Sequence, residues 1–176
     1  KTSVFAVPYC DGKYNFNPKK KLSFPEKIDV QIAKSQKWYV NYFNLVQDLG
    51  SVNWKDQKKI KNKFKKSFNG KVIVYYDNNI NCEFKAKIKI RGGRGDHINE
   101  MNPSLDIKLK NGHINNNSNF ILFVPKARNG KNEVFITTLF QDLKIMAPET
   151  FYTNVKINDQ DRFKYIYQEE INSQFL

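Results

Sequence analysis

Two segments of alternating apolar and charged residues, separated by a run rich in glycine, most constrain how this chain can fold. Apolar side chains alternate with lysines over residues 84–90, and with aspartate or lysine over residues 105–110. A period of two residues indicates a β-strand with one face buried and the other in water. The sequence therefore predicts two strands, joined by a segment that contains Gly92, Gly93 and Gly95.

The glycine segment has two interpretations. Glycine adopts positive φ without steric cost and lets a ligand approach the backbone closely, and successive N–H groups in such a segment can bind an anion. One interpretation is a plain connection between two strands. The other is a phosphate-covering loop followed by a strand lysine, as in protein kinases. The kinase spacing of three glycines is absent, so the segment alone leaves both open.

Hydrophobic periodicity predicts the remaining elements. Further strands are expected at residues 27–32, 71–76, 151–157 and 163–168. Apolar residues at helical spacing predict two helices early in the chain, at residues 35–49 and 54–68. A third helix is predicted at residues 131–146, packed on the sheet through a stripe of Phe135, Leu139 and Leu143.

Five short motifs follow one another in the second part of the chain. The first two are an arginine-glycine strand end at residues 91–97 and a Ser-Leu-Asp-Ile-Lys-Leu strand at residues 104–109. A Pro-Lys-Ala-Arg-Asn-Gly-Lys-Asn-Glu segment follows at residues 125–133. The last two are Val-Lys-Ile-Asn at residues 155–158 and a strand ending in glutamate at residues 165–170. In this order they resemble the CotH family of atypical protein kinases over roughly residues 70–176. The chain departs from the family after Asn158, where the family often has Gly-x-Tyr.

This resemblance, with the predicted elements, implies an α+β fold like the small lobe of a protein kinase. Its sheet would be mainly antiparallel, with about five strands and one packed helix. Residues 70–176 would form the lobe. Residues 1–69 would form an N-terminal extension with one strand and two helices, a helical elaboration of the lobe.

The resemblance also implies a nucleotide site. Six residues would cover, bind or support the nucleotide: Gly92, Gly93, Gly95, Lys108, Glu133 and Glu169. Lys108 would pair with the phosphates and Glu133 would hold that lysine. Alternatives stay open, because Lys108 also fits an exposed strand lysine and Glu133 fits a favourable charge at a helix N-terminus. Lys126 and Arg128 fit either phosphate ligands or a basic loop.

The activity that the resemblance implies is transfer of phosphate from ATP, with Mg²⁺, to hydroxyl groups of a protein substrate. In the family, the general base and the Mg²⁺ ligands lie in a C-terminal lobe that would begin near Leu176. We therefore expect these residues alone to bind nucleotide weakly at most and to transfer no phosphate. The alternative is a non-catalytic structural or binding protein, such as a particle or spore coat component. Either function suits a cytoplasmic or particle-associated protein.

The chain is strongly basic, with a formal net charge of +13. Such a charge favours acidic partners such as nucleic acid, anionic surfaces or nucleotide phosphates. The lysines are spread over most segments, so a generally basic composition explains the charge as well. Nucleic acid is thus the less favoured partner, and we expect the lysines of residues 55–66 to form a solvated face.

Other features exclude classes of site. Cys10 and Cys82 predict neither a disulfide framework nor a metal site, and His97 and His113 are too isolated to build one. No apolar run approaches the length of a membrane span.

Overall fold

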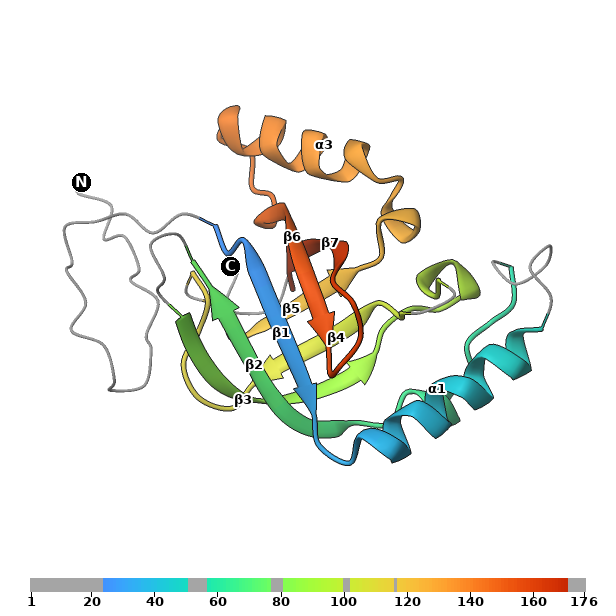
Figure 1. Ribbon diagram of the computed structural model, residues 1–176. Helices are drawn as coiled ribbons and strands as arrows, with labels where there is room; N and C mark the ends of the chain where they lie inside the picture. Colours follow the sequence, from blue (N-terminus) through green and yellow to red (C-terminus); the bar gives the residue numbers. More distant parts are fainter. Residues whose placement is uncertain (1–23, 51–56, 77–80, 100–101, 116, 171–176) are drawn as a thin grey trace.

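The computed structural model describes residues 24–50, 57–76, 81–99, 102–115 and 117–170. Strands of this part of the chain close into a seven-stranded barrel in the order β1-β2-β3-β4-β5-β7-β6 (Figure 1). Neighbours are antiparallel except for β1 and β6, which are parallel. The strands are β1 Lys27–Ile32, β2 Phe68–Tyr75, β3 Asn81–Ile90, β4 Leu105–Leu109, β5 Asn119–Phe123, β6 Thr150–Ile157 and β7 Phe163–Glu169.

The barrel overturns the expected α+β fold. A kinase-like small lobe, with a sheet of about five strands and one packed helix, is wrong for this chain. One pairing closes the sheet, because β1 pairs with β6 as well as with β2. β5 is a further strand of the wall, between β4 and β7. β1 comes from residues 1–69 and lies in the same barrel as the strands of residues 70–176.

The predicted strand positions are confirmed, to within a few residues at their ends. In β3 the apolar side chains from Phe84 to Ile90 point into the barrel and are buried, while Lys85, Lys87 and Lys89 point outward. β5 was missed, because residues 120–124 form an unbroken apolar run without alternation. Both faces of β5 are buried, the inner one in the barrel core and the outer one beneath other elements.

The first predicted helix is confirmed as α1, Ser35–Leu49. Its apolar face packs on the barrel core and carries Trp38, Tyr42, Leu45 and Leu49. The second prediction is wrong in its described part, since residues 57–68 hold an isolated β-bridge at Lys59, the 3₁₀ turn η1, Asn62–Phe64, and the start of β2, but no α-helix. Residues 54–56 lie outside the described part. Ile60 and Phe64 are buried from a largely non-helical segment, so spacing by four residues did not require an α-helix.

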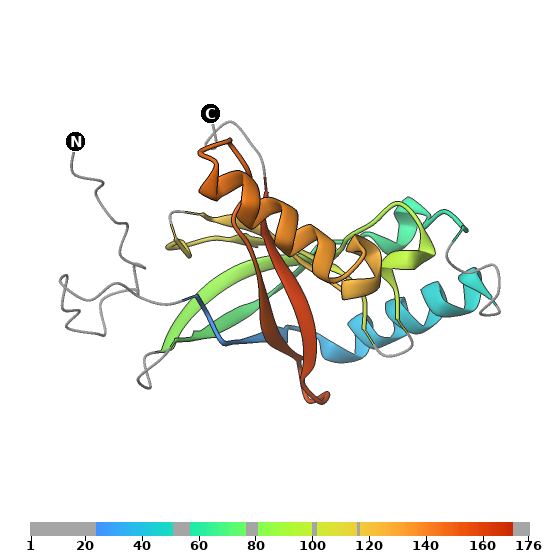
Figure 2. The same cartoon turned by 90° about the horizontal axis from the view of Figure 1, so that it is seen from above.

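Helix α3, Lys131–Asp142, lies outside the barrel against β6, next to the 3₁₀ turn η4, Pro125–Arg128 (Figures 1 and 2). The predicted packing stripe is wrong, because Phe135, Leu139 and Leu143 are 66%, 41% and 60% exposed. Thr137 is buried and Val134 packs over the small outer cluster. This helix carries apolar residues on several of its sides, so periodicity could not identify the side that is buried.

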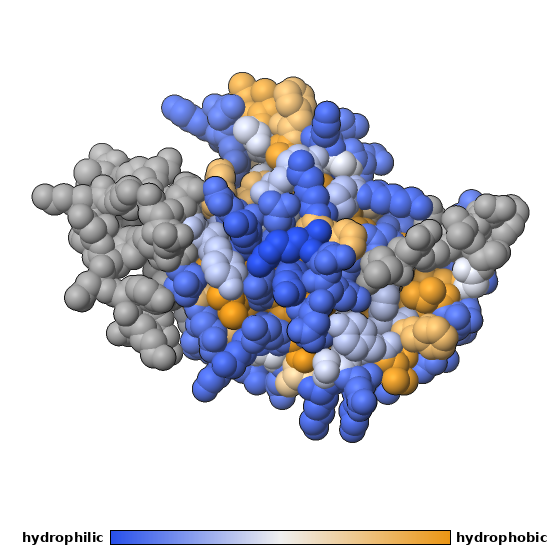
Figure 3. Space-filling model, in the orientation of Figure 1, coloured by the Kyte–Doolittle hydropathy of each residue, from blue (hydrophilic) through white to orange (hydrophobic). Residues whose placement is uncertain are grey.

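An apolar ridge therefore remains exposed along α3 and just after it, visible as the orange side chains over α3 in Figure 3. This α3 ridge consists of Phe135, Ile136, Leu139, Phe140, Leu143, Ile145 and Met146.

Two further findings concern the cysteines and the length of the helices. Cys82 is buried in the barrel and is disulfide-bonded, a bond that the cysteine pattern did not predict. Cys10 lies outside the described residues. Within the described ranges, no helix is both long enough and apolar enough to cross a membrane.

Candidate functional site

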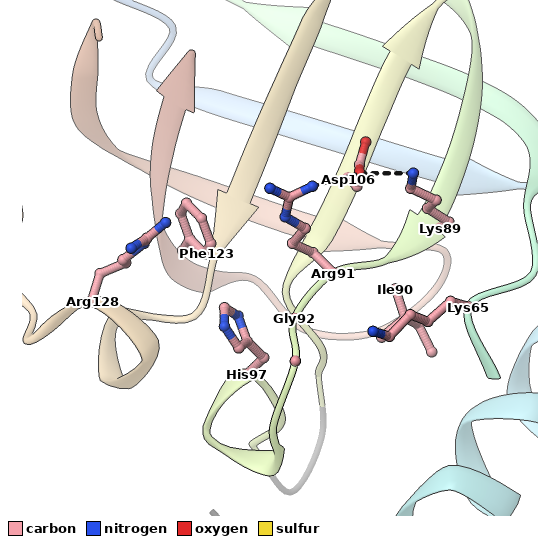
Figure 4. Close-up of a pocket in the computed structure, with 10 residues that line it drawn as sticks. Lys65, Lys89, Ile90, Arg91, Gly92, His97, Asp106, Phe123 and Arg128 are labelled. Atoms are coloured by element: carbon pink, nitrogen blue, oxygen red, sulfur yellow. Dashed lines mark hydrogen bonds and ion pairs between the residues drawn. The ribbon is translucent and has the colours of Figure 1, made fainter. Parts of the chain in front are cut away.

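A pocket of about 420 Å³ opens on the outer wall of the barrel, where β3, β4 and β5 meet η4 and the 3₁₀ turn η3, Gly95–His97 (Figure 4). We call it the cationic pocket, because four lysine and arginine side chains line it: Lys65, Lys89, Arg91 and Arg128. His97 and Phe123 also line it, together with a single carboxylate, Asp106. Its lining therefore has an excess of positive charge.

One wall of the pocket is an ion-pair network centred on Asp106, whose side chain is only 8% exposed. Asp106 points outward from β4 opposite Lys89 of β3, and its Oδ2 lies 3.0 Å from Lys89 Nζ. Arg91 Nη1, just after β3, lies 3.2 Å from the same oxygen and 3.5 Å from Glu170 Oε1. A buried carboxylate shared by two cations fixes their positions and leaves some of their donors for a ligand.

The facing wall is built on Phe123, at the end of β5. The guanidinium group of Arg128 lies over this ring, with its Cζ 4.2 Å from the ring centroid. The centroid of the His97 ring lies 5.7 Å from that of Phe123. Nε of Arg128 and Nδ1 of His97 are buried without a hydrogen-bond partner. An unsatisfied buried polar group costs about 1–3 kcal/mol, so an oxygen-bearing ligand that pairs with these atoms would stabilise the site.

The glycine segment positions His97. Gly92 has φ +117°, a conformation that favours glycine, and a Cβ there would overlap the His97 ring. Residues 58–60 hold the segment from outside, because Ile60 N donates to Gly93 O over 2.9 Å and Gly95 N donates to Lys58 O over 3.0 Å. Close approach of backbone to a side chain, rather than flexibility, explains the glycine at position 92.

The electrostatics of the pocket keep His97 neutral at pH 7. Burial lowers the pKa of His97 below its ordinary value of 6.5, and the charges of Arg128, Arg91 and Lys65 lower it further, against the opposing effect of Asp96. A dianion among these cations would reverse that balance, since it would favour the imidazolium form.

The residues predicted from sequence are only partly brought together. Gly92 and Gly93 line the cationic pocket, whereas Gly95 is buried in η3. Lys108 is exposed on the outer face of β4, and among the described residues no ion pair joins it to Glu133. Glu133 instead accepts a hydrogen bond of 2.6 Å from Gln168 Nε2. Of the two alternative phosphate ligands, Arg128 lines the pocket.

Glu169 belongs to a second polar cluster, together with Glu149 and Asn115. Its Oε2 accepts a hydrogen bond of 3.3 Å from Glu149 N, and Glu149 Oε2 accepts one of 3.0 Å from Asn115 Nδ2. The hydroxyl oxygens of Tyr76 and Tyr167 are buried without a partner. Burial raises the pKa of Glu149, and the charge of Glu169 raises it further although the Asn115 hydrogen bond lowers it. Burial also raises the pKa of Glu169.

We expect Glu149→Gln to raise the melting temperature at pH 7 but not at pH 4. A carboxyl whose folded pKa is raised favours the folded state when protonated, and this contribution disappears as pH rises from the ordinary value of 4.5 through the folded pKa. Glutamine stays neutral and can still accept from Asn115, so the variant keeps the contribution. Thermal unfolding followed across this pH range tests it. Glu83→Gln, at a 53% exposed side chain paired with Lys71, is the control expected to show little change.

Comparison with known proteins adds no family to this geometry. No family model matches the chain, and it has no match among curated proteins. Within the described ranges, no group of three or more His, Cys, Asp or Glu side chains is arranged to hold a metal ion.

Proposed function

We propose that this protein binds the phosphate groups of a nucleotide such as ATP in the cationic pocket. The observation that supports this most directly is the cationic lining of the pocket, in which His97 and Arg128 each also have a buried nitrogen without a hydrogen-bond partner. Guanidinium groups bind phosphate oxygens through paired donors, and lysine adds a point charge. Gly92 and Gly93 lie in the lining, as a phosphate-covering segment requires.

Each charged residue has a separate part in this proposal. Arg128 and Lys65 would approach the phosphates directly, because no carboxylate among the described residues pairs with either of them. Arg91 and Lys89 would contribute donors while Asp106 holds them in place. His97 would take up a proton as the anion binds, so proton uptake should accompany binding.

Transfer of the bound phosphate to a protein hydroxyl, with Mg²⁺ carried on the nucleotide, would need a further lobe that supplies the general base and the Mg²⁺ ligands, as the resemblance to CotH kinases implies. No described residue is assigned as general base. The nucleotide proposal rests on the cationic pocket alone and holds with or without that step.

Isothermal titration with ATP, adenosine and inorganic phosphate tests the proposal. ATP and phosphate should bind to the wild-type protein, and adenosine should bind far more weakly because it has no phosphate. Arg128→Gln and Lys65→Gln should each weaken ATP binding about tenfold or more, since hydrogen bonds to charged groups contribute roughly 1.5–3 kcal/mol. Arg128 also packs on Phe123, so weaker binding in Arg128→Gln can come from a disturbed fold as well as from a lost phosphate contact. Lys65→Gln tests the pocket without removing that packing contact.

Lys164→Gln is the matched control, at an exposed lysine on β7 that does not line the pocket. Its ATP affinity should equal that of the wild type. Equal affinities in all three variants, or adenosine binding as tightly as ATP, would show that the cationic pocket is not the phosphate site.

A further inference from the structure

A row of lysines leads along the outer face of the barrel to the cationic pocket. Lys85, Lys87 and Lys89 are exposed at successive outward positions of β3, and the same alternation continues to Arg91 in the pocket. Two residues of a strand advance about 6.8 Å. Lys108 and Lys110 continue the positive face onto β4 and its end. We call Lys85, Lys87, Lys89, Lys108 and Lys110 the lysine row.

The fold itself gains nothing from this concentration of charge. Lys87 lies directly opposite Lys108 in the β3–β4 register, and like charges in that position destabilise a sheet. The neighbouring carboxylates are already paired, Asp106 with Lys89 and Arg91, and Glu83 with Lys71. Within the described residues, no ion pair involves Lys85, Lys87 or Lys108. An anionic partner would relieve their repulsion.

The row fits a chain of phosphates better than a protein surface. The outward positions of β3 and β4 carry charged or amide side chains and no aromatic ring, so they offer neither an apolar contact nor a stacking platform for bases. Regularly spaced cations without such a platform bind a phosphate backbone irrespective of base sequence. The recessed pocket at the end of the row suits one flexible strand, whose terminal phosphate carries up to two negative charges.

We propose that this face binds a single-stranded nucleic acid, with its terminal phosphate in the cationic pocket and the following phosphodiesters along the lysine row. The placement of the terminal phosphate rests on the function proposed above. The lysine row is a separate observation, carried by the β3–β4 register and by the absence of partners for Lys85, Lys87 and Lys108 in the described ranges.

Fluorescence anisotropy with a short labelled oligothymidylate tests this proposal. The oligonucleotide carries a 5′-phosphate, a 3′-phosphate or no terminal phosphate. One of the two phosphorylated forms should bind at least about tenfold more tightly than the unphosphorylated form, since a charged hydrogen bond contributes roughly 1.5–3 kcal/mol. Arg128→Gln should remove that difference.

The triple variant Lys85→Gln/Lys87→Gln/Lys108→Gln should bind the oligonucleotide roughly 100-fold more weakly at about 0.1 M salt. Each lost phosphate contact lowers the magnitude of the slope of log affinity against log salt concentration by about 0.7, and the variant loses one contact for each of its lysines. Its ATP affinity should stay close to that of the wild type. The control Lys37→Gln/Lys131→Gln/Lys164→Gln removes the same charge from α1, α3 and β7, and should weaken binding only slightly.

Three results would overturn the proposal: equal weakening in the two triple variants, no effect in either, or no preference for a terminal phosphate. Failure of the nucleotide function looks different. ATP binding would then be absent from the wild type or indifferent to Arg128→Gln, whatever the lysine-row variant does.

Discussion

Replacing Gly92 with alanine is expected to lower the free energy of unfolding by roughly 3 kcal/mol, the cost of a non-glycine residue in a strained conformation together with a displaced neighbour. At φ +117° an L side chain is strained whatever space surrounds it. Here the new methyl group would also overlap the His97 ring, which packs on Phe123 and cannot move freely. For a chain of this size the melting temperature should fall by about 10 °C.

Gly93→Ala is the matched control for this prediction. A Cβ at position 93 would meet no atom within 4 Å, and the backbone of Gly93 is outside the left-handed region. Alanine there should leave stability unchanged or raise it by up to about 1 kcal/mol, because it restricts the unfolded chain. Chemical denaturation of both variants gives the comparison. Equal losses would mean that the glycine segment does not have the conformation described for it.

Strand alternation predicted most of the barrel wall but not its closure. β3 could be recognised because its inward apolar residues alternate with outward lysines, a pattern that only a half-buried strand requires. β5 lacked that pattern because η4 and α3 cover its outer face, so Ile121 and Phe123 are buried as well. Closure depends on the parallel pairing of β1 with β6, and no local pattern specifies a partner more than 100 residues away.

The site was only partly predictable for a similar reason. Alternation placed Asp106 and Lys108 together on the outer face of β4, and the resemblance favoured Lys108 as the phosphate ligand. The strand register, which alternation does not specify, sets Asp106 opposite Lys89 and Lys108 opposite Lys87. The clearest signal available in the sequence was Arg128, one of the two basic residues within the turn η4 that precedes α3, and it lines the pocket.

The layer between α3 and the barrel leads to the last prediction. Ile166 points outward from β7, is fully buried, and packs with Ile121 and Phe123 beneath α3 and η4. Ile166→Ala removes buried methyl groups and leaves a cavity, so we expect it to lower the free energy of unfolding by about 2–5 kcal/mol.

Phe135→Ala is the informative counterpart, because helical periodicity predicted Phe135 as the packing residue of this helix. Its side chain is 66% exposed on the α3 ridge, so truncation should change stability by no more than about 0.5 kcal/mol. Urea denaturation of the two variants compares them directly. A larger loss for Phe135→Ala than for Ile166→Ala would mean that α3 packs on the barrel through its ridge, and that Val134 and Thr137 do not form the buried face described here.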